Sequence, residues 1–442
     1  MVPVNTVAAP GGQVGLSFPT NFRWGVSATA YQIEGAVDAD GKGPSIWDTF
    51  AHEPGRIADG STGDVACDHY HRYPRDIELM TGLGVDSYHL SIAWSRVQPA
   101  GSGPVNPAGL GYYDRLVDAL LEAGVDPVAT LYHWDLPQPL QDGGGWLKRD
   151  TAARFGEYAG IVGAALGDRV KLWVTLNEPF VHMAYGYAFG VHAPGQALLF
   201  DALPAGHHQL LGHGLAVAAL RATTGSPVTI ANHYSPVRVL GGTEADREAG
   251  AWYDALHNRM FTDPLLGRGY PEGFQMPVCD GDLEVIAAPL DALAVNYYAP
   301  TGVRAPQDPD APLPFDLVPL DGYPVTDFDW PVVPEALTEL LLRLHREYGL
   351  PLYVTENGCS YPSTKDDPER VEFLSRHIDA VRAALSGGAD VRGYFVWTLT
   401  DNFEWAEGFS KRFGLVHVDF DTQQRTPKAS YHWYRDLIAR SR

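Results

Sequence analysis

The stretch Leu352-Tyr353-Val354-Thr355-Glu356-Asn357-Gly358 joins a short apolar strand to a carboxylate and then to an Asn-Gly turn. An earlier stretch, Leu172-Trp173-Val174-Thr175-Leu176-Asn177-Glu178-Pro179, has the same design. One glutamate at the end of a strand is explained by a hydrogen bond to the loop that follows. Two matched segments, far apart in the chain, indicate instead that Glu178 and Glu356 act together.

These two strands belong to a longer alternation of strands and helices. Further strand candidates lie near residues 24, 90, 130, 230, 295 and 396, with expected ranges such as 86–94, 126–134, 228–234, 293–298 and 391–399. Helical patterns lie between them, including 151–166, 368–386, a stripe that stops at Gly84, and a helix that begins at Asn106-Pro107. Alternation of this kind predicts a parallel sheet.

Eight such strands in one chain favour a single-domain (β/α)8 TIM barrel with extended βα loops over two doubly wound domains. No linker divides the chain, and barrels of this class often exceed the usual length of one domain. We predict a lead-in over residues 1–17 and the catalytic barrel over 18–442. The proline- and aspartate-rich segment 300–334 is expected to be a surface loop.

Composition excludes several classes of partner. The 442-residue chain is 45% hydrophobic, and its net charge of -22 would repel nucleic acid and anionic membranes. No run approaches the ~20 apolar residues of a membrane span, and Met1 through Gly15 lack the basic and apolar regions of a signal peptide. We therefore expect a cytoplasmic protein. The 11 Trp, 22 Tyr and 17 Phe residues suit a core, although a sugar site would also use them as flat platforms.

The sequence predicts neither a metal nor a cofactor. Three cysteines without CxxC spacing form no disulfide framework or zinc site. The Asp38-x-Asp40 stretch begins like a calcium loop, but Lys42 and Thr49 occupy the fifth and twelfth positions. His69 and His71 could share a strand face, yet a third ligand is missing.

Polar and aromatic residues crowd the predicted strand exits, which meet at one mouth of a TIM barrel. Each residue alone could be structural, but together they form a set suited to a sugar: carboxylates, amides and imidazole bind hydroxyls, and indole stacks on a pyranose ring. Two carboxylates flanking a glycosidic bond serve both retaining and inverting hydrolases. The residues alone leave that choice, and the role of each carboxylate, open. Besides the two glutamates, the set comprises Gln32, His133, Trp134, Asn177, Asn296, Tyr298, Trp397, Glu404 and Trp405.

Several motifs resemble those of glycoside hydrolase family 1, the β-glucosidase family, in family order from about Phe18 to Tyr434. They are Phe22-Arg23-Trp24-Gly25, Gln32-x-Glu34-Gly35, Ser45-Ile46-Trp47-Asp48, His133-Trp134, Thr175-Leu176-Asn177-Glu178-Pro179, His192-Ala193-Pro194-Gly195, Asn296-Tyr297-Tyr298, Val354-Thr355-Glu356-Asn357-Gly358, Asp401-Asn402-Phe403-Glu404-Trp405 and Arg412-Phe413-Gly414-Leu415. The resemblance implies a retaining β-glycosidase without a cofactor, whose partner is a small β-glycoside or an oligosaccharide.

The resemblance also implies a role for each residue. Glu356 would be the nucleophile, Glu178 the acid/base, and Asn177 a contact of the 2-hydroxyl. Net retention would place the two carboxyl groups ~5–5.5 Å apart. Because successive strand residues face opposite sides, Asn177 and Glu178 predict a bulge or a strand end. The remaining roles are glycone binding by Gln32, His133, Glu404 and Trp405, a platform at Trp397, orientation of Glu356 by Asn296 and Tyr298, and closure of the pocket by Phe413.

Two positions refine this expectation. Glu404 stands where the branch acting on 6-phosphorylated sugars has serine, so we predict a non-phosphorylated glycone: glucose, with fucose and galactose tolerated. Tyr88-His89-Leu90-Ser91 replaces the family pattern Tyr-Arg-Phe-Ser. That arginine, by resemblance, favours the ionised nucleophile; with His89 in its place, we hypothesise that Glu356 is less firmly ionised. The alternatives are a transglycosidase using the same intermediate and a non-catalytic sugar-binding barrel.

Overall fold

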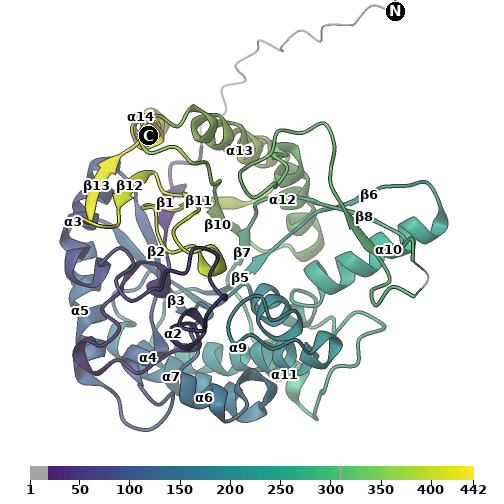
Figure 1. Ribbon diagram of the computed structural model, residues 1–442, viewed down its shortest axis with the longest axis horizontal. Helices are drawn as coiled ribbons and strands as arrows, with labels where there is room; N and C mark the ends of the chain where they lie inside the picture. The colour runs from purple at the N-terminus through teal and green to yellow at the C-terminus, as the bar shows by residue number, and fades with distance from the viewer. Residues whose placement is uncertain (1–17, 309) are drawn as a thin grey trace, which may run out of the picture.

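Eight parallel strands close into a barrel at the centre of the molecule, as the strand analysis predicted (Figure 1). The computed structural model describes residues 18–308 and 310–442, so the predicted lead-in over 1–17 lies outside the described residues. Around the barrel the strands follow chain order, and the first pairs with the last. They are β1 (Arg23–Ser27), β2 (Ser87–Ser91), β3 (Asp126–Tyr132), β4 (Leu172–Asn177), β5 (Val228–His233), β7 (Leu293–Asn296), β10 (Leu352–Asn357) and β11 (Val391–Trp397).

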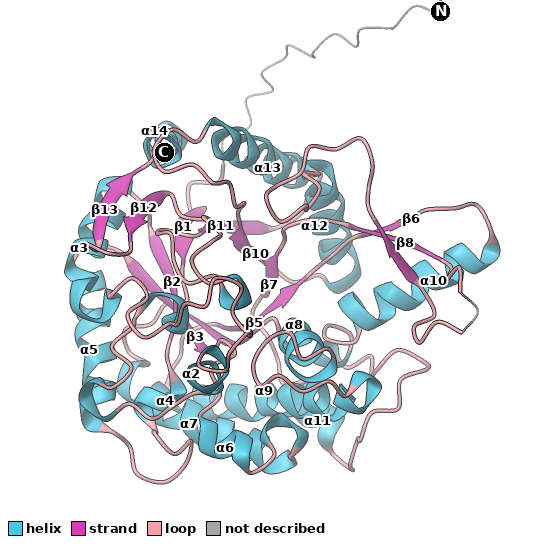
Figure 2. Cartoon of the chain, viewed as in Figure 1, coloured by secondary structure: helices cyan, strands magenta, loops and turns pink. Residues whose placement is uncertain are grey.

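Helices form the outer layer, and the longest of them alternate with the barrel strands (Figure 2). These are α3 (His69–Leu83), α5 (Pro107–Glu122), α7 (Arg149–Leu166), α9 (Leu203–Thr223), α12 (Pro334–Tyr348), α13 (Pro368–Ser386) and α14 (Ala429–Ser441). Shorter helices occupy the loops: α1 (Ala30–Ile33), α2 (Ile46–Ala51), α4 (Trp94–Val97), α6 (Gln138–Asp142), α8 (Pro179–Val181), α10 (Glu244–Asp254) and α11 (Asp282–Ile286). Within the described ranges, none of the helices combines the length and apolar character needed to cross a membrane.

The barrel interior is filled by side chains rather than left as a channel. Val128, Val174 and Phe395, from three different strands, form part of one buried cluster there. Gly25 on β1 leaves room for the Phe395 ring, because a Cβ at that position would lie 2.2 Å from the ring. Because side chains fill the barrel interior, a binding site is expected among the loops at the carboxyl ends of the strands.

Three expectations from the sequence are wrong in detail. Segment 300–334 is not only a loop: β8 (Thr301–Arg304) and β9 (Asp316–Val318) join β6 (Val237–Val239) in a small sheet. That sheet forms because Val303 and Phe315 pack against α10 in a satellite core. The predicted strands also overrun by one to three residues at several ends; Trp134, for example, has φ 74° and cannot extend β3.

His69 and His71 do not share a strand face, because both lie in the first turn of α3. His69 is buried and pairs through Nδ1 with Asp76 Oδ2 at 2.7 Å. His71 is exposed and contacts Asp68. The helix begins at His69, so Pro74 lies inside it and cannot donate the usual backbone hydrogen bond to the carbonyl of Tyr70.

Candidate active site

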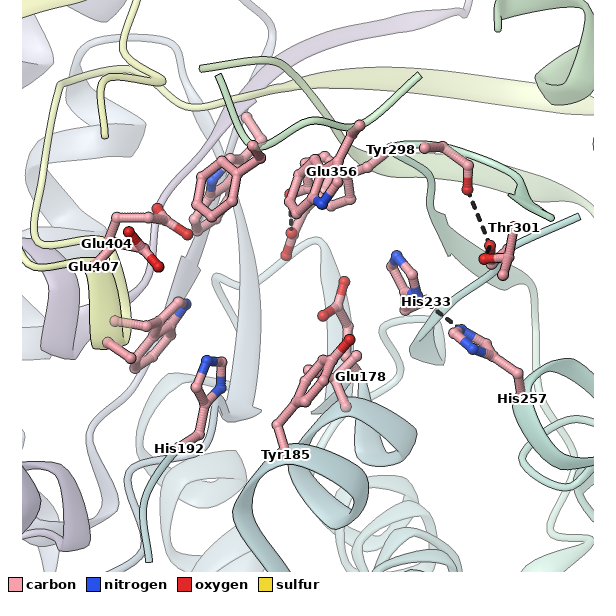
Figure 3. Close-up of a pocket in the computed structure, with 18 of the residues that line it drawn as sticks. Glu178, Tyr185, His192, His233, His257, Tyr298, Thr301, Glu356, Glu404 and Glu407 are labelled. Atoms are coloured by element: carbon pink, nitrogen blue, oxygen red, sulfur yellow. Dashed lines mark hydrogen bonds between the residues drawn. The ribbon is translucent and has the colours of Figure 1, made fainter. Parts of the chain in front are cut away.

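A pocket of about 410 Å³ opens at the carboxyl ends of the strands (Figure 3). Most of the predicted site residues line it, whereas Gln32, Asn177 and Asn296 are buried directly behind its wall and His89 lies deeper in the barrel. The predicted residues that line the pocket are His133, Trp134, Glu178, Tyr298, Glu356, Trp397, Glu404, Trp405 and Phe413.

Glu178 stands at the abrupt end of β4. The strand stops at Asn177 after a register shift against β5, and Glu178 takes a left-handed conformation with φ 46°. This is the strand end that the spacing predicted. Trp134 and Trp405, two further residues of the pocket wall, also have positive φ values of 74° and 47°. Such conformations are strained for residues other than glycine and cluster at functional sites.

Glu356 lies at the end of β10, opposite Glu178. The Tyr298 hydroxyl donates to Glu356 Oε2 at 2.8 Å, whereas Oε1 is buried and has no hydrogen-bond partner within the described residues. Gly358 allows this turn to approach β11, because a Cβ there would lie 1.8 Å from the Trp397 carbonyl oxygen. One oxygen is therefore held and the other keeps its lone pairs available.

Burial raises the pKa of both carboxyls, that of Glu178 to about 7 and that of Glu356 well above its usual value. Negative charge on Glu178 further opposes ionisation of Glu356. Because a negative charge on one carboxyl opposes ionisation of the other, the two groups titrate as a pair rather than independently. A pair of this kind can supply one acid and one carboxylate at the same time.

Four side chains form a hydrogen-bonded row with a fixed direction, which starts behind the pocket wall and ends at His133 in the wall. The Thr355 hydroxyl donates to Asn296 Oδ1 at 2.7 Å, which turns the Asn296 amide nitrogen toward β4. That nitrogen donates to Glu178 Oε1 at 2.8 Å and to Asn177 Oδ1 at 3.1 Å. Asn177 Nδ2 in turn donates to His133 Nε2 at 2.9 Å. Neutral His133 consequently carries its proton on Nδ1 and acts as a donor.

This row adds partners to one of the predicted site residues. Asn296 was expected to orient Glu356, and its side chain does lower the pKa of that carboxyl; its amide nitrogen also donates to Glu178 and Asn177, because Thr355 occupies its oxygen. Tyr298 does contact Glu356 as expected.

One end of the pocket combines an amide, a carboxyl group and indole rings. Gln32 Nε2 donates to Glu404 Oε2 at 3.1 Å, and Gln32 Oε1 is buried without a partner within the described residues. Burial raises the pKa of the Glu404 carboxyl to about 8. The Trp405 ring stacks on Tyr31, with centroids 6.2 Å apart. These side chains offer donors, acceptors and flat apolar surface to a polyhydroxylated ligand.

A buried ion pair fixes the loop that carries Glu404 and Phe413. Lys428 Nζ donates to Asp401 Oδ1 at 2.8 Å, and the Gly414 amide donates to the same oxygen at 3.0 Å. Because Asp401 and Gly414 lie at the two ends of this loop, the contact sets its span.

The pocket also contains residues that the sequence analysis gave no role. Most come from the long segments between barrel strands, whereas His233 is the last residue of β5. They lie mostly away from Glu404 and are Val181, Tyr185, His192, His233, Tyr253, His257, Phe328 and Trp330. His192 belongs to a quoted motif, and His233 lies at the exit of the predicted strand 228–234, where the rule of polar residues at strand ends could have found it. The others carry no local signal, since only the closed barrel brings them to the mouth.

His89 on β2 is buried, and its Nε2 lies 2.6 Å from Thr130 Oγ1. Burial lowers the pKa of His89 to about 4, so the imidazole is neutral. The main influences on the Glu356 pKa are burial, the carboxyls of Glu178 and Glu404, and the polar groups of Tyr298 and Asn296; none of these is a cation.

Comparison with known proteins places this geometry in context. Residues 15–442 match the model of glycosyl hydrolase family 1. Thermostable β-glucosidase B of Thermobispora bispora is 47% identical, over 96% of this chain and 91% of that protein. A bifunctional β-D-glucosidase/β-D-fucosidase of Bifidobacterium breve is 44% identical, over 96% of this chain and 98% of that protein. Among solved structures, the β-glucosidase of Thermotoga maritima in complex with glucoimidazole has a TM-score of 0.93 at 40% identity, and the match covers 96% of this chain and 99% of that one.

Proposed function

The chain belongs to glycosyl hydrolase family 1, as its sequence motifs indicated, and on this premise we propose that it is a retaining β-glucosidase. Its substrates are non-phosphorylated β-D-glucosides, with β-fucosides and β-galactosides also accepted. The observation that carries the proposal is the pair Glu178 and Glu356 in one pocket, with raised pKa values and one unpartnered oxygen on Glu356. The presence of both carboxyls argues against a non-catalytic sugar-binding barrel.

The first step forms a glycosyl-enzyme. Glu356 Oε1 attacks the anomeric carbon while Glu178 gives its proton to the glycosidic oxygen, and the bond between that oxygen and the anomeric carbon breaks. A pKa of about 7 suits Glu178 to this role, since an acid is most effective near the working pH. Tyr298 holds the other oxygen of Glu356 and thus orients the attacking one.

The second step releases the sugar. Glu178, now ionised, takes a proton from water as the water oxygen attacks the anomeric carbon, and the ester bond to Glu356 breaks. Two inversions give net retention. This route requires a separation of ~5–5.5 Å between the carboxyl groups, which stays a prediction.

The glycone end explains the predicted preference for unphosphorylated sugars. None of the residues that line the pocket in the described part of the chain is lysine or arginine, the usual partners of a phosphate. A phosphate there would be desolvated beside Glu404 without a compensating cation.

A panel of 4-nitrophenyl glycosides tests this proposal. We expect the highest kcat/KM for β-glucoside or β-fucoside, lower activity on β-galactoside, and at least about 100-fold less on 6-phospho-β-glucoside, because an unpaired buried charge costs several kcal/mol. Preference for the phosphorylated substrate, or no turnover of any β-glycoside, would contradict the proposal.

The neutral imidazole of His89 predicts an unusual pH profile. Activity requires ionised Glu356, so kcat/KM rises as the pH increases through the pKa of that group in the free enzyme. A cation at position 89 lowers this pKa. We therefore expect His89→Arg to move the acid limb of the kcat/KM profile to lower pH, while His89→Gln, which stays neutral, keeps the native limb. Superimposable acid limbs for the native enzyme and His89→Arg would refute this.

A cytoplasmic location is part of the proposal. It is supported by Cys67, Cys279 and Cys359, which are all unpaired, as is usual in a reducing compartment.

A further inference from the structure

A row of polar side chains lines the pocket on the side opposite Glu404 (Figure 3). His233 Nδ1 lies 2.8 Å from His257 Nε2, and His257 Nδ1 lies 2.9 Å from the Tyr253 hydroxyl. The Tyr253 hydroxyl lies 3.2 Å from Thr301 Oγ1, which lies 2.6 Å from Ser235 Oγ. Ser235 Oγ finally donates to the carbonyl of Ala299 at 3.0 Å. The row therefore ends on a group that can only accept.

The carbonyl of Ala299, which can only accept, fixes the direction of every other hydrogen bond in the row. Since the one hydroxyl proton of Ser235 goes to the carbonyl, Ser235 accepts from Thr301, and Thr301 accepts from Tyr253. Tyr253 then accepts from Nδ1–H of His257, which leaves His257 Nε2 as an acceptor. His257 Nε2 accepts from Nδ1–H of His233. If Tyr253 instead donated its proton to His257, no proton would lie between the hydroxyl groups of Tyr253 and Thr301, because Thr301 donates its own proton to Ser235.

Both imidazoles are neutral, as this order requires. Burial lowers the pKa of His233 to about 4 and that of His257 well below its ordinary value. A neutral imidazole has one donor and one acceptor nitrogen. Because Nδ1 of His233 carries the proton, Nε2 is the acceptor.

His233 presents this acceptor to the pocket. Its ring lies against that of Tyr298, with centroids 6.1 Å apart and planes 25° apart, and Tyr298 holds Glu356. Nε2 of His233 has no hydrogen-bond partner within the described residues, and its surface is not fully buried. The opposite end of the pocket, at Gln32 and Glu404, has the groups that suit the glycone. The leaving group therefore occupies the His233 side.

We propose that His233 Nε2 accepts a hydrogen bond from a hydroxyl group of the leaving group, so that the enzyme selects disaccharides or short oligosaccharides over glucosides of apolar alcohols. This inference rests on the proposed β-glucosidase activity. A pocket of about 410 Å³ is of a size that encloses ligands as large as a disaccharide. His233 is thus a specificity-determining residue on the leaving-group side.

Two variants on two substrates test the inference. His233→Leu removes the acceptor, whereas His233→Gln supplies another through Oε1. Cellobiose provides hydroxyl donors in the leaving group; 4-nitrophenyl β-D-glucoside provides none. For His233→Leu we expect the loss of kcat/KM on cellobiose to exceed that on the nitrophenyl substrate by about tenfold, the effect of one hydrogen bond, and we expect His233→Gln to restore most of the difference.

Equal losses on both substrates, or none, would overturn the inference and leave His233 a structural residue. If the native enzyme hydrolysed neither substrate, the proposed function itself would fail instead. The direction of the row has its own readout in the ¹⁵N spectrum of histidine-labelled protein, with His233 assigned from its absence in His233→Gln. We expect Nδ1 of His233 to be protonated and Nε2 to be unprotonated; the opposite tautomer would contradict the derived order.

Discussion

Replacing Glu356 with glycine should reduce kcat on 4-nitrophenyl β-D-glucoside by about 10⁶-fold, the scale of loss when a catalytic nucleophile is removed. The glycosyl-enzyme cannot form without this carboxylate, and Glu178 alone can only protonate the leaving group. The cavity left by the side chain opens the α face of the sugar to a small anion. External azide should therefore restore turnover and give α-glucosyl azide, in which the configuration is inverted.

Glu404→Gln is the control for this experiment, because it alters another, partly buried carboxyl of the same pocket. It should weaken glycone binding, but azide should neither rescue it nor change the configuration of its product. Failure of azide to rescue Glu356→Gly, with folding verified by circular dichroism, would count against Glu356 as nucleophile.

Replacing Glu178 with glycine should produce a loss that depends on the leaving group. General acid catalysis contributes about 10²–10⁴-fold, so kcat/KM should fall by that factor on cellobiose, whose leaving alcohol needs a proton. On 2,4-dinitrophenyl β-D-glucoside, whose leaving group departs unprotonated, kcat/KM should fall far less. Azide should now yield β-glucosyl azide, because it attacks the glycosyl-enzyme from the face where water normally enters.

The same substitution should change the pH profile. Glu178 must carry its proton to act as the acid, so native activity falls as the pH rises through its pKa of about 7. In Glu178→Gly this alkaline limb should disappear. Equal losses on both substrates together with a retained alkaline limb would show that Glu178 is not the acid.

The architecture was predictable because each barrel strand carries its own signal. Helix α13, for example, has the range that its pattern indicates, and strand β10 begins at Leu352 as predicted and extends through Asn357. Helix α9 escaped notice, since it is buried on most of its surface and shows no amphipathic stripe. Strands β8 and β9 were missed because three or four residues are too few to show a period, and tertiary packing decides their conformation.

The position of the pocket residues at the strand ends could also be predicted, but not their hydrogen-bond partners. Strand exits converge in any TIM barrel, so Glu178 and Glu356 could be placed together from chain position alone. The partner of Asn296 could not, because it depends on which way Thr355 turns the amide. The acceptor at His233 depends on a row of contacts that begins at the backbone of Ala299, and no local pattern encodes that row.

In the proposed mechanism Glu356 becomes covalently bonded to the sugar, and trapping that bond is its most direct test. Fluorine at C2 of 2,4-dinitrophenyl 2-deoxy-2-fluoro-β-D-glucoside slows both steps, while the good leaving group keeps the first one fast enough to load the enzyme. Intact mass should increase by one fluoroglucosyl group per chain, and peptide mapping should place the adduct on Glu356. An adduct on Glu178 or Glu404, or inactivation without an adduct, would contradict the account.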